Sequence, residues 1–325
     1  MPILYLAKVN VNSNIFDVYA NKTSIENIKT ELFKSVHSGS SYVQLAEDPK
    51  SKEIFNSDAV EYNNSRFSFQ EIEKQEGIEL NPVLDDYLDP RRDQSHWDGR
   101  VIIGKVVRSY EKNTEKLNPT TNKMEETTVS ENVSIRFFFD LEDELITFCE
   151  RQNFGFSQFM IAFSKLLDLS LSNSETPSEF EIYLQKDEDA LNNKILEFES
   201  VKKVKATLVP PNSNQDDLKA LAEEAGYTVD MKEANATRLE VELSSDNMAM
   251  ESKTIKDMIK NVSKGYGNMT VNGIDKSGKN KTVSSSRGAA FTGNVSSSTD
   301  ENEFNRESAN LIRKLLEKIK ARRKQ

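Results

Sequence analysis

The sequence has 325 residues, a net charge of −10 and 30% charged residues, which suits about two soluble domains with a core of their own. Its single cysteine, Cys149, excludes an intramolecular disulfide, and no apolar run approaches the roughly 18 residues of a transmembrane helix. The opening segment MPILYLAKVNVNSN lacks the basic region and the long apolar region of a signal peptide, so we expect a cytoplasmic protein with no membrane contact.

Charge divides the chain into an acidic body and a basic end. Residues 253–325 contain 16 basic and seven acidic residues, a net charge of +9, which leaves −19 for residues 1–252. Such asymmetry indicates a basic end that contacts something anionic: DNA or RNA, an acidic protein, or the acidic body of a neighbouring subunit. Simple solvation of a helical tail is the alternative.

The first elements mix strands with one helix. Residues 3–11 predict a strand, and residues 15–19 predict a short second strand that pairs with it. A helix capped by Thr23 or Ser24 follows, with apolar residues at helical spacing. Residues 42–70 then predict short strands joined by polar turns.

A charged loop follows the acidic segment 69–88, which we expect to be mostly helix and loop. The loop DYLDPRRDQSHWDG, residues 86–99, holds the only tryptophan and one of the two histidines. Arg91 and Arg92 suit bidentate binding of phosphate or carboxylate, and His96 lies between two aspartates, a setting that suits a general base or a metal ligand. Arg91, Arg92 and His96 are therefore a candidate anion site, and an ion-paired surface loop is the alternative.

A long hairpin is predicted in the middle of the chain. Residues 100–110 and 133–139 both read as strong strands, and the second alternates apolar side chains onto one face. The polar stretch between them, residues 111–131, predicts an extended tip.

Two helices are expected after this hairpin, over residues 140–152 and 156–167. The second carries an apolar stripe at helical spacing, which favours a place in the core over a cofactor site. Cys149, on the first helix, is interpreted as a buried and inert thiol. The polar linker 170–178 ends an N-terminal domain of residues 1–170.

The second domain, residues 179–286, alternates strands with helices, one of them capped by Asn214. Its strands are expected at residues 180–184, 203–209 and 237–243 and in a closing hairpin at 268–286. The predicted fold class is α+β: two domains with mixed or antiparallel sheets packed by helices, plus a C-terminal amphipathic helix.

The closing hairpin lies in a basic stretch, KGYGNMTVNGIDKSGKNKTV, residues 264–283. Its glycine spacing matches neither a P-loop nor a dinucleotide fingerprint. Lysines around a tyrosine that can stack on bases are suited to follow a phosphate backbone, so this stretch is a candidate DNA- or RNA-binding surface. A surface hairpin with solubilising lysines is the alternative. The candidate residues are Lys264, Tyr266, Lys276, Lys279 and Lys281.

A flexible Ser/Gly-rich linker is expected over residues 287–300, followed by a basic amphipathic helix over residues 301–325. The apolar stripe of this helix must be buried on the body, on another copy or on a partner. We favour a homo-oligomer or a co-encoded protein as its occupant. The candidate partner-binding residues are Leu311, Ile312, Leu315, Leu316 and Ile319.

Acidic clusters at strand ends raise the question of Mg²⁺, which nucleases bind through carboxylates. The clusters are Asp140, Glu142, Asp143 and Glu144, and the pair Glu240 and Glu242. Helix capping explains the first cluster better, and alternation with apolar residues places the pair on a solvent-facing side. We predict no metal and no cofactor.

The order of several segments resembles a known family. A strand ending in FFFDLEDELITFCERQNFGFSQFMIAFSKLL is followed by KVKATLVPPNSNQDDLKALAEEAG, then by NATRLEVELSS and by the hairpin GYGNMTVNGIDKSGK. These segments, covering about residues 95–285, resemble the domain-of-unknown-function 4747 type of bacterial proteins. The resemblance implies a phage-defence neighbourhood and transfers no active-site residues.

We therefore expect a component of a bacterial anti-phage system that acts by protein–protein contact or self-assembly and that contacts nucleic acid through its basic hairpin. A metal-dependent nuclease or another effector enzyme is the alternative.

Overall fold

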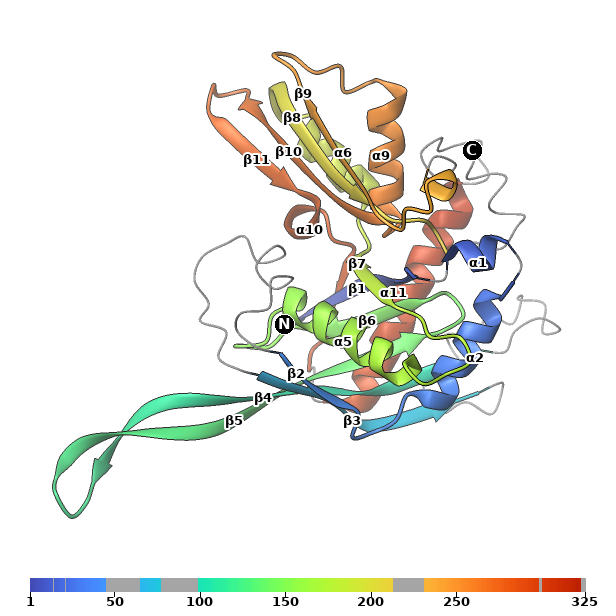
Figure 1. Ribbon diagram of the computed structural model, residues 1–325. Helices are drawn as coiled ribbons and strands as arrows, with labels where there is room; N and C mark the ends of the chain where they lie inside the picture. The colour runs from blue at the N-terminus through green and yellow to red at the C-terminus, as the bar shows by residue number, and fades with distance from the viewer. Residues whose placement is uncertain are drawn as a thin grey trace.

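The computed structural model describes residues 1–13, 15–20, 22–44, 65–76, 99–212, 231–297 and 300–322. This part of the chain forms seven helices and twelve strands in two antiparallel sheets (Figure 1), which confirms the α+β class. The candidate anion site and the helix expected to begin at Asn214 lie outside the described residues. In the part that is described, no helix is long and apolar enough to cross a membrane.

The large sheet has the strand order β12-β1-β6-β5-β4-β3-β2, and β7 also pairs with β1. Its strands are β1 (Ile3–Val11), β2 (Ser41–Gln44), β3 (Ser65–Gln75), β4 (Val101–Asn118), β5 (Lys123–Asp140), β6 (Leu145–Cys149), β7 (Phe180–Leu184) and β12 (Thr292–Asn294). β1 lies inside this sheet, because β6 pairs with one of its edges and β7 and β12 share the other.

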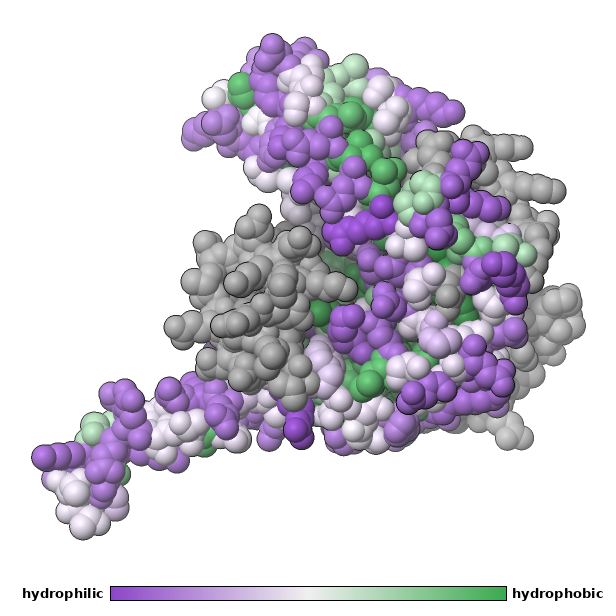
Figure 2. Space-filling view, viewed as in Figure 1, coloured by the Kyte–Doolittle hydropathy of each residue, from purple (hydrophilic) through white to green (hydrophobic). Residues whose placement is uncertain are grey.

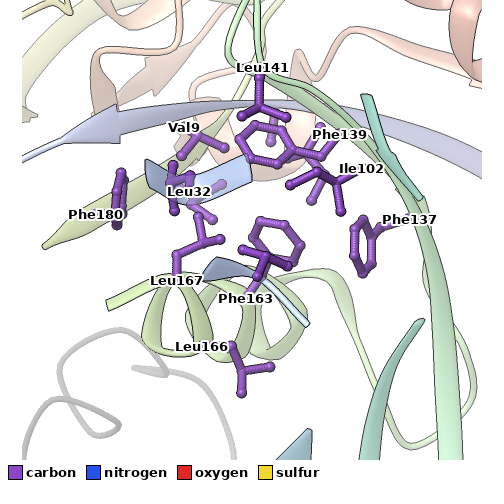
Figure 3. Packing of buried hydrophobic residues seen from close by; sticks show 14 of the residues in the cluster. Val9, Leu32, Ile102, Phe137, Phe139, Leu141, Phe163, Leu166, Leu167 and Phe180 are labelled. Atoms are coloured by element: carbon purple, nitrogen blue, oxygen red, sulfur yellow. The ribbon is translucent and has the colours of Figure 1, made fainter. Parts of the chain in front are cut away.

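A phenylalanine-rich core fills one face of the large sheet. The helices nearest to it are α1 (Ile15–Tyr19), α2 (Ile25–Ser35) and α5 (Phe156–Leu171). Phe163 of α5 lies edge-on to Phe137 with ring centroids 4.9 Å apart, and Phe159 stacks on Phe148 at 4.1 Å. Figure 3 shows Phe163, Leu166 and Leu167 of α5 among the side chains of this cluster. The apolar stripe of α5 is therefore core, as expected.

The C-terminal helix α11 (Glu301–Arg322) covers the opposite face of the large sheet. Its residues Phe304, Ile312 and Leu315 are buried in a second cluster. The sheet contributes Leu4, Leu6, Val101, Ile103, Phe138, Leu145 and Cys149 to that cluster. The large sheet thus lies between α2 and α5 on one side and α11 on the other, so that apolar side chains on both of its faces are covered.

The small sheet has the order β11-β10-β8-β9. Its strands are β8 (Phe198–Leu208), β9 (Leu239–Ser244), β10 (Gly267–Asp275) and β11 (Asn280–Ser284), and its helices are α6 (Glu188–Ile195), α9 (Lys253–Ser263) and α10 (Ser285–Gly288). A third cluster lies between α6, α9 and the apolar side of β8 and β10. β10 begins beside the large sheet and runs away from it, so the turn between β10 and β11 is at the outer end (Figure 1).

Three elements differ from the sequence-based expectation. Residues 145–149 form strand β6 and not a helix. Both faces of this strand are buried, so its sequence is a continuous apolar run without the alternation that marks a half-exposed strand. Residues 15–19 form helix α1 and not a second strand. β3 extends to Gln75, into the segment expected to be helix and loop.

Two segments expected elsewhere belong to the large sheet. β7, expected in the second domain, pairs with β1 over Ala7–Val11. β12 lies within the segment expected to be a linker and pairs with the start of β1, and Val295 beside it is buried. The linker was predicted only from its content of serine and glycine, and composition alone cannot reveal a short strand that pairs at a sheet edge.

Candidate functional site

A buried ion cluster joins the large sheet to the segment that leaves β8. Glu144 Oε2 lies 2.9 Å from Lys8 Nζ, and Glu144 Oε1 lies 3.6 Å from Lys29 Nζ. Asn212 Nδ2 donates to Glu144 Oε2 at 2.9 Å, and Asn212 Oδ1 accepts from the N–H of Val11 at 2.8 Å. Burial alone would lower the pKa of Lys8, but Glu144, together with Tyr266 and Asp143, raises that pKa overall. Lys8 is therefore charged at neutral pH.

The acidic turn between β5 and β6 is built around this cluster. Asp140 Oδ1 accepts from the N–H of Glu142 at 2.9 Å and closes the turn, which ends at Glu144 with φ of 54°. Lys8 Nζ donates to the carbonyl of Asp143, and Lys29 Nζ donates to the carbonyl of Glu142, both at 2.8 Å. The two lysines thus hold the turn by its carbonyl oxygens as well as by Glu144.

The same turn contains the carboxylates considered for a nuclease. Asp140 is fully buried, desolvation raises its pKa well above the usual range, and its Oδ1 is already used to close the turn. Glu240 and Glu242 form pairs with Lys205 and Lys203 on the small sheet. Across the described ranges, no three acidic, histidine or cysteine side chains gather as metal ligands.

Cys149 is buried on β6, facing α11. Burial raises the pKa of its thiol to about 12, so the thiol stays protonated at neutral pH. The interpretation of Cys149 as a buried thiol is confirmed, although it lies on a strand and not on a helix.

A second set of polar contacts joins the two sheets. Lys186 Nζ donates to the carbonyl of Gly267 at 2.7 Å and to Asn268 Oδ1 at 3.1 Å. Gln185 Nε2 donates to the carbonyl of Lys264 at 2.9 Å. Lys186 is fully enclosed, and burial lowers its pKa to about 7. We name this set the seam, and it fixes the start of β10 against the end of β7.

Two glycines allow the chain to pass through the seam. Gly265 and Gly267 have φ values of 81° and 137°, which side-chain-bearing residues rarely adopt. A Cβ at Gly267 would overlap the carbonyl oxygen of Thr207, and one at Gly265 would lie 2.6 Å from Lys8 Cβ. The glycine pair in the basic stretch therefore serves close backbone approach between strands.

Helix α11 is tied down at both ends. Near its start, Glu301 Oε2 lies 2.9 Å from Arg136 Nη1 of β5. Near its end, Lys318 Nζ lies 2.9 Å from Asp187 Oδ2 and 3.0 Å from Asp189 Oδ2, at the first turn of α6. The helix thus connects the large sheet to the helical layer of the small sheet.

The stripe expected to bind a partner is the side of α11 that faces the large sheet. Leu311, Ile312 and Leu315 are buried there, and Leu316 and Ile319 are partly buried against the same cluster. Of the occupants considered for this stripe, the structure shows the protein's own body. The helix therefore does not offer these five side chains as an open surface.

The five candidate nucleic-acid-binding residues fall into two separate places. Lys264 and Tyr266 lie at the seam, where Tyr266 is half-buried close to Lys8. Lys276 and Lys279 are exposed at the β10–β11 turn, and Lys281 pairs with Glu197. The structure therefore separates the stackable tyrosine from the exposed lysines by the length of β10, which is about 30 Å at roughly 3.4 Å per residue.

The hairpin of β4 and β5 projects from the body as a long arm (Figure 1). β3 accompanies β4 only as far as Tyr110, and β6 accompanies β5 only from Phe137. Beyond these points the two strands pair with each other up to Asn118 and Lys123. Figure 2 shows the arm extending from the body, with hydrophobic residues near its end. We name residues 111–131 the arm.

The tip of the arm carries exposed apolar side chains. Leu117 and Met124 are directly opposite each other in the register, and each is 57% exposed. The sequence predicted the hairpin and its long polar tip but gave no sign that the tip would be an ordered ribbon with an apolar pair. The enclosed ammonium groups of Lys8 and Lys186 were also missed. Lys8 had a signal, because it is a lysine inside an apolar strand, whereas Lys186 follows the end of β7 and precedes acidic residues.

Comparison with known proteins extends the resemblance noted from the sequence. The family described as "Domain of unknown function (DUF4747)" matches residues 22–306, from just before α2 to the first residues of α11. Searches of curated proteins and of solved structures gave no significant match. The chain therefore belongs to the DUF4747 family.

Proposed function

We propose that the protein is an interaction component of a bacterial anti-phage system and that it acts in the cytoplasm by assembling with itself or with a co-encoded protein. The observation that carries this proposal is the arm, an ordered ribbon whose tip exposes an apolar pair. A two-stranded ribbon without further packing has little stability of its own in water. An ordered ribbon of this length is therefore best explained by a function in contact with another molecule.

The defence setting comes from the family resemblance and not from the geometry. What the geometry favours is contact over catalysis. The buried thiol, the enclosed Asp140 that closes its turn and the ion-paired Glu240 and Glu242 are all engaged in the fold.

The arm can be removed without disturbing the body. Tyr110 and Glu131 are opposite each other, so residues 111–130 can be replaced by Asn-Gly, which favours the two-residue turn of a hairpin. In cells that carry the gene with its neighbours, we expect this arm-shortened variant to lose protection against phage and to lose co-purifying protein. A variant that protects as well as the wild type and retains the same complex would contradict the proposal.

A second function is favoured by the exposed lysines of the β10–β11 turn. Lys276 and Lys279 present positive charge to solvent and are suited to contact phosphate groups. Binding of labelled DNA or RNA should then weaken steeply as salt rises, and replacement of both lysines by glutamine should weaken it at every salt concentration. Binding that is absent, or that does not respond to salt, would remove this function.

The nuclease alternative has a direct test as well. Labelled DNA and RNA incubated with the protein and Mg²⁺ or Mn²⁺ would be cut if carboxylates outside the described ranges complete a metal site. Cleavage that is lost in Asp140→Ala or Glu142→Ala would favour the enzyme over the interaction component.

A further inference from the structure

The two faces of the arm differ in charge. Because side chains alternate along a strand, the register places Glu111, Glu115 and Glu126 on one face together with Leu117 and Met124. The other face holds the lysines of the arm, accompanied by Glu125 and Glu131. Those lysines are Lys112, Lys116 and Lys123. We name the first face, with its three carboxylates, two apolar side chains and no lysine, the acidic face.

The acidic face is poorly suited to stand alone in water. Glu115 is directly opposite Glu126, and like charges at opposed positions destabilise a strand pair. The next pair towards the tip is Leu117 and Met124, with more than half of each side chain exposed. A partner that supplies cations beside an apolar group would relieve both defects at once.

The outer end of the small sheet has what the acidic face lacks: lysines beside an exposed apolar side chain. Leu196, just after α6, is 64% exposed. Lys281 pairs with Glu197, and the N–H of Lys276 donates to the carbonyl of Glu197 at 3.3 Å, which brings the β10–β11 turn beside Leu196. We name this surface the basic end. It consists of Leu196 with Lys194, Lys276, Lys279 and Lys281.

The acidic residues near the basic end are largely engaged within it. Glu197 is paired with Lys281, and the lysines around it lower its pKa. Asp275 Oδ1 accepts from the N–H groups of Ser277 and Lys279 and shapes the turn. Together with Glu199 on β8, the acidic residues at this end number three, against four lysines. The net charge of the basic end is therefore positive.

We propose that the acidic face of the arm of one copy binds the basic end of the small sheet of a second copy. The arm and the outer end of the small sheet project from different parts of the molecule (Figure 1), so the contact joins two copies. Each copy keeps one arm and one basic end, so the contact is head-to-tail and builds a ring or a chain of copies. The inference rests on the proposed function and deepens it by naming the occupant of the arm.

The test exchanges the charges of the two surfaces. The arm variant is Glu115→Lys with Glu126→Lys, and the end variant is Lys194→Glu with Lys276→Glu. Light scattering after size exclusion should show that each variant alone loses the wild-type assembly, because both of its possible contacts then join like charges. An equal mixture of the two should regain assembly, since each kind of contact between the variants again joins opposite charges.

A matched control separates this contact from a general effect on the arm. Thr114 and Thr127 are opposite each other on the other face, so Thr114→Lys with Thr127→Lys adds paired lysines away from the acidic face. This control should assemble like the wild type, and far-ultraviolet circular dichroism should be the same for all variants. A monomeric wild type, a mixture that stays monomeric, or single variants that still assemble would each overturn the inference.

The outcome also distinguishes this inference from the proposed function. If the arm-shortened variant loses its complex in cells while the mixture of charge variants stays monomeric, the arm binds a different protein. The proposed function then stands, and the second copy is excluded as occupant. Sensitivity of DNA or RNA binding to the end variant, with assembly unchanged, would assign the basic end to nucleic acid.

Discussion

Removing the carboxylate of Glu144 should cost far more stability than removing a more exposed carboxylate that contacts the same lysine. Glu144 is 11% exposed and lies 2.9 Å from Lys8 Nζ and 3.6 Å from Lys29 Nζ. Glu144→Gln keeps the shape of the side chain, but it leaves Lys8 without its carboxylate and Lys29 with Glu26 alone. Breaking a buried pair in this way costs about 3–5 kcal/mol. Because the cluster retains slight access to water, we expect the lower end of that range.

Glu26→Gln is the matched control. Glu26 Oε1 lies 3.2 Å from Lys29 Nζ, and Glu26 Oε2 lies 2.7 Å from Nη2 of the buried Arg100. Because the Glu26 side chain is 53% exposed, water can partly replace its carboxylate, so the cost should be clearly smaller than that of Glu144→Gln. Urea denaturation followed by circular dichroism gives both changes in the free energy of unfolding. Equal losses for the two variants would refute the view that the Glu144 cluster is held in a low-dielectric environment.

The pH dependence of the same variant has a definite sign. Glu144 raises the pKa of Lys8 in the folded protein above its ordinary value of 10.5, so the stabilisation is complete below pH 10.5 and is lost as pH rises through the folded pKa. The stability difference between wild type and Glu144→Gln should therefore be constant near neutrality and shrink in strong alkali. A difference that grows with pH in that range would contradict the pairing.

Three further predictions concern the seam and the second core. Gly267→Ala should destabilise the protein more than Gly278→Ala in thermal unfolding, because both positions have positive φ but only at Gly267 would the Cβ overlap a carbonyl oxygen. The folded pKa of Lys186 is about 7, whereas the unfolded chain holds this proton up to about pH 10.5, so stability should rise with pH between these values. Lys186→Met should flatten that rise. Parallel curves of unfolding free energy against pH for variant and wild type would count against this. Phe304→Ala should cost about 3–5 kcal/mol in chemical denaturation, because its ring is fully buried between α11 and the large sheet, and a cost below about 1 kcal/mol would show that α11 is not docked.

The periodicity of apolar residues and the charges at helix ends predicted the strands and helices that they mark. The alternation in residues 133–139 and the apolar stripe of residues 156–167 lie in β5 and α5, and α11 begins at Glu301 as the acidic first turn predicted. Residues 145–149 were assigned to a helix because a short run of apolar residues carries no period that separates a buried strand from a helix. Only the covering of both faces of β6, a property of the whole fold, decides that question.

Sequence-based prediction of the candidate surfaces was limited for the same reason. The basic stretch was identified as one surface, yet β10 places Tyr266 at the seam and Lys276 at the outer end. The apolar stripe of α11 was recognised correctly, but its occupant depends on Leu4, Leu6 and Phe138, which lie far away in the chain. The acidic face of the arm requires the register of Glu115 with Glu126, which only the paired strands define.

The most direct test of action by assembly is the mass of the purified full chain in solution. Sedimentation velocity over a wide concentration range should show species heavier than the 36.9 kDa monomer, with a share that grows with concentration. The arm-shortened variant, measured beside it, should remain at the mass of a monomer. Wild-type and arm-shortened proteins that are both monomeric at every concentration, or that assemble to the same extent, would contradict self-assembly through the arm.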